Sequence, residues 1–432
     1  MREEVTSSEA AVLSGQRSSE VATRRPRFLV IGGKLKHVRK ARELGLDVVH
    51  AQFPDEYDRG HWPYVDQALL LDYGDIDRLL PLVRALHEAY PFQAAVSLYE
   101  LGLLPAARIN EALGLGGESV ATVELLLDKW RMRRHLAAKG ISPMASAVGR
   151  SAQDVQEFVH AHGLPIIVKP IRESGSLAVF CIRDRADVEA VAERFRSLDG
   201  QVATRDLSSA ESFDEFLMEE FLDGPEVSVE TLSFDGRHVI VAVTDKETEG
   251  FVEIGHSQPS GCSSETLREV AQLVTDFLDA VGLRNGPGHT EVKLTSRGPR
   301  IVESHNRTGG DGINELTEVA YGVDMERYAL GAGFGVVEPL TTSPEPRGGA
   351  ALRFLTPEPG RVVEVTGVDA VRADPAYVDL QVKVEPGDEV PPLTWNEDVA
   401  GRVIARGATT AEAIAHGQRL AAAIHVRTEL VK

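Results

Sequence analysis

Near its N-terminus the chain alternates between apolar runs and an amphipathic segment, and this alternation constrains the fold more than any other feature. The apolar run RFLVIGG ends in Gly32-Gly33, KLKHVRKARELG follows at helical spacing, and DVVHAQ is again extended. Two strands joined by a helix in this way lie parallel in one sheet. A second amphipathic helix, begun by Asp75, and the apolar stretch 94–100 continue the pattern. We therefore predict a doubly wound α/β domain over residues 26–116.

The glycine pair at the end of the first strand is weak evidence for nucleotide binding. The segment IGGKLKHVRKAREL lacks the GxGxxG spacing, and no suitably placed acidic residue follows it. We interpret Gly32-Gly33 as a tight turn between the strand and the helix.

The rest of the chain consists mainly of extended runs separated by hairpin-like turns, which favours antiparallel sheets. Runs such as EVSVETLSF and HVIVAVTDK are typical of strands, and one long helix, SETLREVAQLVTDFLDAVG, interrupts them. We predict an α+β domain over residues 117–340 and a small C-terminal α+β domain over residues 341–432. Residues 1–25 are charged and rich in serine, so we predict a disordered tail there.

Charge and composition exclude several classes of function. Lys and Arg total 46 and Asp and Glu total 66, which gives a net charge of 46 − 66 = −20. Such a charge disfavours nucleic acid or an anionic membrane as the partner. A polyanion such as a nucleotide must then bind locally, together with a divalent cation. The two cysteines are too few for a disulfide framework or a cysteine-rich zinc site.

The sequence contains no recognisable targeting segment. No apolar run approaches the roughly 18 residues of a membrane span, and the N-terminus has no apolar core of the kind found in signal peptides. We therefore expect a cytoplasmic protein.

The segment TEVKLTSRGPRIVESHNR is the most informative local feature. A loop over residues 295–299 would pair Lys293 with Ile301 and Glu291 with Glu303, and alternation would place Ile301, Glu303 and His305 on one side. Two carboxylates directly opposite each other repel unless a cation lies between them. Hard oxygen ligands suit Mg²⁺ completed by water and phosphate oxygens. The alternative is a solvated sheet face.

Two further segments could contact a nucleotide. Lys169 ends the apolar strand LPIIVK, and residues 173–176, Glu-Ser-Gly-Ser, could fold over phosphates through their backbone N–H groups. In EEFLDGPEVSVE, the backbone of Glu220–Leu222 could read an adenine edge, and Glu226 suits ribose hydroxyls. The alternatives are a terminal lysine whose stem packs on apolar surface, a simple hairpin turn, and an acidic hairpin.

A polar, glycine-rich loop follows the paired carboxylates, over residues 306–314. Arg307 in this loop could stabilise charge that develops on a phosphoryl group or a tetrahedral intermediate. The N–H groups of the loop, at the start of a helix, could hold a substrate carboxylate. His256, in EIGHSQP, is either a general base or substrate contact, or simply a histidine at a strand end.

The order of these segments is more specific than any one of them. Lys129 in LLDKWRMR, Lys169 in PIIVKP, MEEFLDGPEVSVE, then Glu291, Glu303 and Arg307 together resemble the ATP-grasp superfamily over residues 26–340. The resemblance implies a pre-ATP-grasp α/β domain, then an ATP-grasp core of a small and a large lobe, then the C-terminal domain.

The resemblance also implies roles for individual residues. Phosphate contacts would come from Lys129 and Lys169, and Mg²⁺, with Mn²⁺ as an alternative, would be held by Glu291 and Glu303. Arg307 would steady an acyl phosphate. A flap over the phosphates would be formed by Ser174, Gly175 and Ser176. The adenine pocket would be lined by Glu219, Glu220, Phe221 and Leu222, and the ribose would be held by Glu226.

One departure from the family pattern concerns the third metal ligand. Many members have Glu-x-Asn-x-Arg, whereas this chain has Glu303-Ser-His305-Asn306-Arg307. His305 thus takes the usual Asn position, and Asn306 should point to the opposite face.

Within the superfamily, the chain most resembles L-amino acid ligases and carnosine-synthase-like enzymes. The segments that carry this likeness are SLYELGLLPAARINEALGL, EIGHSQPS and ESHNRTGGDGINELTEVAYGVDM. The resemblance implies that ATP activates a carboxylate as an acyl phosphate and that an amine then attacks it, with release of ADP and phosphate. His256 and the loop residues Gly309, Gly310, Asp311 and Asn314 would shape the amino-acid sites.

Two alternative functions use the same fold. One is bicarbonate-dependent carboxylation, and the other is a non-catalytic, nucleotide-binding regulator. The sequence does not identify the two substrates, and a homodimer is only the default expectation for a soluble oligomer.

Overall fold

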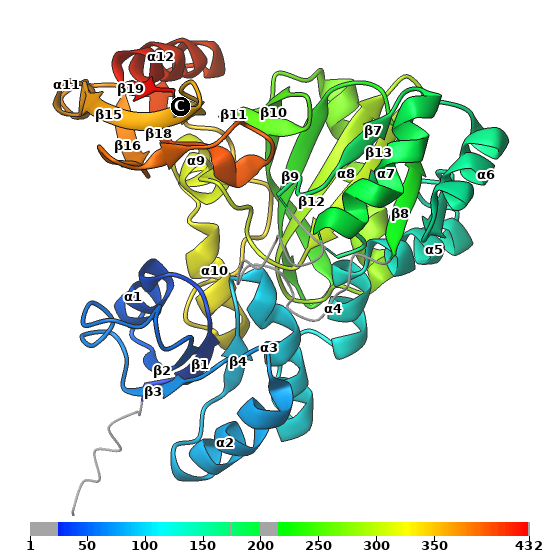
Figure 1. Ribbon diagram of the computed structural model, residues 1–432. Coiled ribbons are helices and arrows are strands. Elements are labelled where there is room, and N and C mark those ends of the chain that lie inside the picture. The colour runs from blue at the N-terminus through cyan, green and yellow to red at the C-terminus, as the bar shows by residue number, and fades with distance from the viewer. Residues whose placement is uncertain (1–24, 173–174, 199–214, 431–432) are drawn as a thin grey trace, which may run out of the picture.

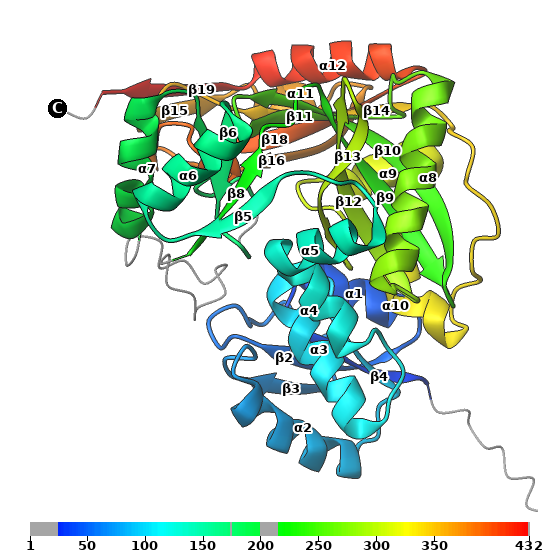
Figure 2. The same ribbon diagram turned by 90° about the vertical axis from the view of Figure 1, so that its right-hand side faces the viewer.

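The computed structural model of the protein describes residues 25–172, 175–198 and 215–430. Apart from Arg25, the predicted N-terminal tail lies outside the described residues, as does Ser174 of the predicted phosphate flap. Figures 1 and 2 show the N-terminal domain below, and the larger sheets and the C-terminal strands above it.

The N-terminal domain is built on a four-stranded parallel sheet in the order β3-β2-β1-β4. Leu29 and Ile31 of β1 pack toward α2 and α3, whereas Phe28 and Val30 pack toward α1 and α10. Helices therefore cover both faces, which confirms the doubly wound domain predicted from the alternation. Its elements are β1 (Arg27–Ile31), α1 (Leu35–Glu43), β2 (Asp47–Gln52), β3 (Gln67–Leu70), α2 (Ile76–Ala89), β4 (Ala94–Val96) and α3 (Glu100–Leu113).

Two helices and a small antiparallel sheet follow. The sheet has the order β5-β8-β6-β7, and α6 and α7 pack on it through a core that includes Phe158, Phe195 and Phe216. This sheet and these helices form the small lobe. The elements are α4 (Val120–Leu127), α5 (Lys129–Lys139), β5 (Ser146–Gly149), α6 (Ala152–His162), β6 (Ile166–Lys169), β7 (Phe180–Ile182), α7 (Arg185–Leu198) and β8 (Phe216–Glu220).

An eight-stranded antiparallel sheet, in the order β13-β12-β9-β10-β11-β14-β18-β16, forms the centre of the molecule. The amphipathic helix α8 begins after Ser263, whose side chain accepts a hydrogen bond from the Thr266 N–H, and buries Val274 and Phe277 against the sheet. The elements are β9 (Glu226–Phe234), β10 (Arg237–Glu249), β11 (Val252–Gln258), α8 (Ser264–Val281), β12 (Gly286–Thr295), β13 (Gly298–His305), α9 (Ile313–Tyr321), α10 (Met325–Gly331) and η1 (Ala332–Phe334).

The C-terminal segment contributes to this central sheet and forms a small sheet of its own, in the order β17-β15-β19. Strands β14, β18 and β16 extend the central sheet, so the sheet crosses the domain boundary that we predict at residue 341. The elements are β14 (Gly349–Leu355), β15 (Gly360–Thr366), α11 (Val368–Arg372), β16 (Tyr377–Val382), β17 (Glu389–Val390), η2 (Asn396–Asp398), β18 (Gly401–Gly407), α12 (Thr410–Ala423) and β19 (His425–Glu429).

Candidate active site

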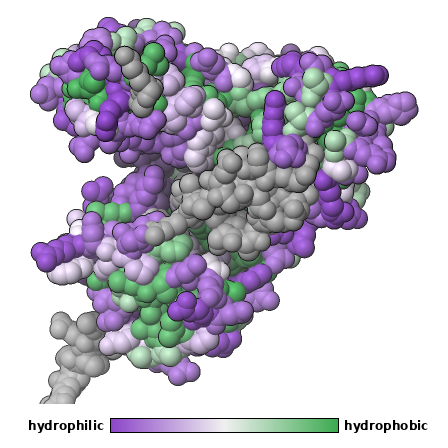
Figure 3. Space-filling view, viewed as in Figure 1, coloured by the Kyte–Doolittle hydropathy of each residue, from purple (hydrophilic) through white to green (hydrophobic). Residues whose placement is uncertain are grey.

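Two adjoining cavities lie where these parts of the chain meet. The inter-lobe cavity has a volume of about 360 Å³ and lies between the small lobe and the central sheet. The loop cavity, of about 330 Å³, lies between the loop over residues 307–312, the N-terminal domain and the C-terminal segment. Gly175 and Asn396 line both cavities. On the face shown in Figure 3, the surface is hollowed between the N-terminal domain and the C-terminal part, and hydrophilic side chains border the hollow.

Most of the predicted nucleotide and metal residues line the inter-lobe cavity, although they come from elements far apart in the sequence. They are Lys129, Lys169, Gly175, Ser176, Glu219, Glu220, Phe221, Leu222, Glu226, Glu291 and Glu303.

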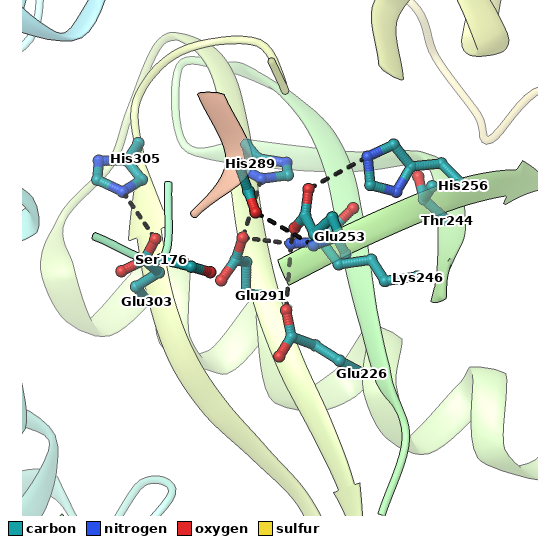
Figure 4. A network of polar contacts seen from close by, with 12 residues as sticks. Ser176, Glu226, Thr244, Lys246, Glu253, His256, His289, Glu291, Glu303 and His305 are labelled. Carbon is teal, nitrogen blue, oxygen red and sulfur yellow. Dashed lines mark hydrogen bonds and ion pairs between the residues drawn. The ribbon is translucent and has the colours of Figure 1, made fainter. Parts of the chain in front are cut away.

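The two predicted metal carboxylates face each other across neighbouring strands. Glu291 of β12 and Glu303 of β13 are register partners, as the hairpin pattern predicts. Both side chains remain partly accessible, with exposed fractions of 16% and 14%. On the same face, His305 Nε2 lies 3.5 Å from Glu303 Oε1, and His289 Nε2 lies 3.6 Å from Glu291 Oε1 (Figure 4).

A β-bulge corrects the rest of the predicted register. Val292, not Lys293, pairs with Ile301, and Lys293 pairs with Arg300, because the extra residue Val302 is left unpaired on β13. The bulge places Ile301 in the core beside Val292, so the prediction that Ile301 shares a side with Glu303 is wrong. The strands also run to Thr295 and from Gly298, so the turn is shorter than the predicted loop over residues 295–299.

Charges around the two carboxylates keep both of them ionised. Burial alone would raise the pKa of Glu303, but Lys129, whose Nζ lies 2.8 Å from Glu303 Oε2, and His305 hold that pKa well below its usual range. Burial would also raise the pKa of Glu291, but the nearby Lys246 ammonium is the main cause that lowers it below its usual value. Two ionised, accessible carboxylates on one sheet face form a donor set of hard oxygens, and this set fits Mg²⁺.

The second predicted lysine is held by a buried carboxylate. Lys169 Nζ lies 2.7 Å from Glu219 Oε2, and the guanidinium of Arg133 donates to the other oxygen of the same carboxylate. Against the effect of burial, Arg133 and Lys169 lower the pKa of Glu219 to about 2. Glu219 thus borders the cavity, but its carboxylate is engaged in holding Lys169 in place.

Arg133 is a residue that the sequence analysis missed. Its Nη1 and Nη2 donate to the carbonyl oxygens of Ile301 and Val302 at 2.7 and 2.6 Å, directly at the bulge. It follows Lys129 by four residues on α5, so both side chains lie on the same face of that helix. This spacing is the signal from which Arg133 could be found.

Residues from the C-terminal segment complete the predicted phosphate flap. Ser176 Oγ donates to the Phe251 carbonyl at 2.8 Å, and the Asn396 N–H donates to the Gly175 carbonyl at 3.2 Å. The side chain of Asn396 accepts from the Glu253 N–H at 3.1 Å. Asn396 therefore joins the flap to the wall of the cavity, and no sequence pattern indicated this role.

The loop over residues 307–312 forms one wall of the loop cavity. Arg307 donates to Glu100 Oε2 from Nε and Nη2, at 3.2 and 2.9 Å, and Gly309, Gly310 and Asp311 line the cavity beside it. Glu100, at the start of α3, was not singled out in the sequence.

Three predicted residues lie apart from these cavity walls. The amide of Asn314 donates to Asp324 at 3.4 Å and accepts from the Glu326 N–H, so it supports the start of α10. His256 is buried, with Nε2 3.2 Å from Glu253 Oε2 and its ring against Phe354, and it is not among the lining residues of either cavity. Asn306 lines a separate cavity on the side of β4 and β12, away from His305.

Three segments of the chain match known domain families. Residues 38–117 match the ATP-grasp N-terminal domain, residues 162–315 the ATP-grasp domain, and residues 353–429 the L-amino acid ligase C-terminal domain 2. These matches include β2 to β4 of the N-terminal sheet, β6 to β13 and most of the C-terminal elements, whereas β1, α4, α5 and β5 lie outside the matched segments. They confirm the ATP-grasp resemblance inferred from the order of motifs.

Among proteins of known function, the chain is 27% identical over 258 residues to the alanine–anticapsin ligase of Bacillus subtilis strain 168, which covers 56% of this chain and 54% of that protein. It is 24% identical over 335 residues to the L-arginine-specific L-amino acid ligase of Bacillus subtilis, which covers 76% and 78% of the two chains. The chain thus spans about half the length of the first of these relatives.

A solved structure has the same fold over nearly the whole chain. The L-amino acid ligase from Bacillus licheniformis superimposes with a TM-score of 0.79 and 21% identity, covering 94% of this chain and 99% of that one. Among the described residues, no helix is both long enough and apolar enough to cross a membrane.

Proposed function

We propose that this chain, which carries ATP-grasp domains together with the C-terminal domain 2 of L-amino acid ligases, is an ATP-dependent carboxylate–amine ligase. It would join two amino acids, or an amino acid and a related acid, through an acyl phosphate, with release of ADP and phosphate. The observation that carries this proposal is the facing pair of ionised carboxylates, Glu291 and Glu303, in a cavity that also holds two lysines and adjoins a second cavity.

The inter-lobe cavity is the proposed nucleotide site. Lys129 and Lys169 would contact the phosphates, the flap at Gly175 and Ser176 would cover them, and the segment from Glu220 to Leu222 would line the adenine. The Phe221 N–H already donates to the Pro165 carbonyl at 3.4 Å, so this segment is anchored to the small lobe. Glu226, at the start of β9, is the proposed ribose contact.

Glu291 and Glu303 are the residues that would hold Mg²⁺, with Mn²⁺ as an alternative. A bound Mg²⁺ would neutralise phosphate charge and polarise the phosphoryl group that is transferred. The lysines and the Arg307 guanidinium add positive charge on the protein side of the same reaction.

The loop cavity is the proposed site of the amino-acid substrates. In its wall Gly310 is exposed whereas Gly309 is buried, and Arg307 stands beside them in an ion pair with Glu100. In this arrangement the carboxylate to be activated and the γ-phosphate would approach from opposite sides of Gly175, which borders both cavities. Closure of the flap would exclude water, which would otherwise hydrolyse the acyl phosphate.

The direct test of the function is ADP and phosphate release with Mg·ATP across single and paired L-amino acids, with product masses determined in parallel. A ligase would release ADP only with the right substrates and would form an amide of the corresponding mass. ADP release that depends on bicarbonate would instead support carboxylation. Tight ATP binding by calorimetry with no turnover on any substrate would support a non-catalytic role.

Replacing Lys169 with alanine is expected to weaken ATP binding by about tenfold to a hundredfold, because a hydrogen bond to a charged group contributes about 1.5–3 kcal/mol. Glu219 keeps Arg133 as a partner in this variant, so the fold should survive. Calorimetric titration with ATP measures the effect, and Lys139→Ala, at an exposed position on α5, is the matched control. Equal ATP affinity in the Lys169 variant and the wild type would contradict the phosphate role.

A further inference from the structure

A buried lysine lies at the centre of an acidic cluster beside the proposed metal site. The ammonium of Lys246, on β10, is only 1% exposed and contacts carboxylates from three other strands (Figure 4). Its Nζ lies 3.1 Å from Glu226 of β9 and 2.6 Å from Glu253 of β11, and it also contacts Glu291 of β12. We refer to Glu226, Glu253 and Glu291 as the acidic trio.

The acidic trio has the arrangement of a cation site. Its members offer carboxylate oxygens that all lie within 4.8 Å of one another, which is close enough to share one ion. Carboxylates at such separations repel unless a cation lies among them. Lys246 is that cation, and it contacts all three carboxylates although it is not itself among the residues that line the inter-lobe cavity.

A single ammonium faces three carboxylates in this cluster, so Lys246 does not offset all of the charge around it. Three further basic side chains each contact one member of the trio: Lys293 lies 3.4 Å from Glu226, His256 3.2 Å from Glu253 and His289 3.6 Å from Glu291.

Glu291 belongs to both groups, since it pairs with Glu303 across the strands and also contacts Lys246. A divalent ion that binds Glu291 must therefore share this carboxylate with the ammonium. We propose that Lys246 is a built-in cation that occupies the place of a metal ion in the nucleotide-free site, so that the site binds divalent metal well only when the metal arrives together with a nucleotide.

This inference rests on the proposed function, because it takes Glu291 as a metal carboxylate. An ion that arrives with phosphate oxygens brings part of its own ligand shell, and it then needs less from Glu291 than a free ion does. Lys246 is a positioning residue, since it acts through Glu291 and is not among the residues that line the cavity. The consequence is that the metal ion binds together with the nucleotide, and that metal ion alone binds only weakly to the site without nucleotide.

The test measures metal binding without turnover. Mn²⁺ is titrated into the nucleotide-free full chain, and free Mn²⁺ is followed by electron paramagnetic resonance, for wild type, Lys246→Met and Lys246→Arg. Lys246→Met removes the competing charge at similar length, so its Mn²⁺ affinity should rise about tenfold or more. Lys246→Arg keeps the charge and should remain close to wild type, as should the exposed control Lys139→Met.

The difference between wild type and Lys246→Met should shrink when a non-hydrolysable ATP analogue is present. Unchanged or weaker Mn²⁺ binding by folded Lys246→Met would overturn the proposal. Should Lys246→Met be unfolded without metal, Mn²⁺ should restore the folded state by circular dichroism, and failure to do so would equally overturn it. Because no product is measured, failure of the ligase proposal is seen separately, in the assay of amide formation.

Discussion

Replacing Glu303 with glutamine is expected to lower the proposed amide-forming activity on the order of a hundredfold or more, because a catalytic metal ion supplies several kcal/mol of charge stabilisation. The substitution keeps the shape of the side chain and removes the charge that faces Glu291. It also removes the charge of the carboxylate that lies 2.8 Å from Lys129 Nζ. The rate of substrate-dependent ADP release, followed as a function of Mg²⁺ concentration, measures the effect.

The control for this variant is Glu265→Gln, at an exposed position on α8 far along the chain from the site. Circular dichroism should show that both variants keep the fold, with some loss of thermal stability in Glu303→Gln because the buried Lys129 faces a neutral side chain. Activity measured well below the unfolding temperatures of both variants then reports on the site. Full activity of Glu303→Gln with an unchanged dependence on Mg²⁺ would remove the metal assignment.

The sequence was sufficient to predict the parts of the fold that depend on local periodicity. Apolar residues of β1 alternate between two buried faces, and the helical spacing that follows β1 admits only a parallel crossover to β2. The strands of the C-terminal segment were also recognisable as strands. Their place in the central sheet was not, because the pairing of β11 with β14 joins residues almost a hundred positions apart, and periodicity carries no information about partners.

In the candidate site, too, contacts between residues close in the sequence could be predicted, and contacts between distant residues could not. Glu291 and Glu303 could be paired from the sequence because one short turn connects their strands. The bulge at Val302 could not be predicted, because Arg133 holds the two carbonyls at the bulge from 168 and 169 positions away. The role of Asn396 could not be predicted for the same reason, because Asn396 and Gly175 are far apart in the sequence and meet only in the folded chain.

Buried charge was the signal that the sequence offered and that we did not use. Lys246 stands in a strand whose preceding residues are apolar, HVIVAVTDK, and a lysine in such a strand needs carboxylates around it. Conversely, the sequence left His256 open between a general base or substrate contact and a histidine at a strand end, and the resemblance placed it at the amino-acid sites. In the structure its ring lies behind Glu253, with a side-chain exposure of 0%.

The second large effect concerns Arg133, which connects three parts of the site. Its guanidinium is 2% exposed, and it donates to Glu219 and to the carbonyls of Ile301 and Val302. Removing one partner of a buried ion pair leaves the other charge uncompensated. Lys169 alone would then have to neutralise Glu219.

Replacing Arg133 with methionine is therefore expected to lower the free energy of unfolding by about 3–5 kcal/mol. Chemical denaturation at neutral pH measures this loss, and Arg134→Met, at the exposed neighbouring position, is the matched control with little expected effect. The double variant Arg133→Met, Glu219→Gln should be less destabilised than the sum of the two single variants, because it no longer buries an unpaired charge. A loss no larger than that of the control would show that Arg133 is not needed to hold Glu219.

The loss in Arg133→Met should also depend on pH, in a direction that the structure fixes. The folded-state pKa of Glu219 is lowered from its ordinary value of 4.5 to about 2 by Arg133 and Lys169, against the effect of burial. A carboxyl with a lowered pKa contributes stability that is present above its unfolded pKa and is lost as the pH falls toward the folded pKa. The difference between wild type and Arg133→Met should thus be constant from pH 7 down to about pH 5 and narrow below that. The part that persists at lower pH measures the two carbonyl hydrogen bonds at the bulge, which do not titrate.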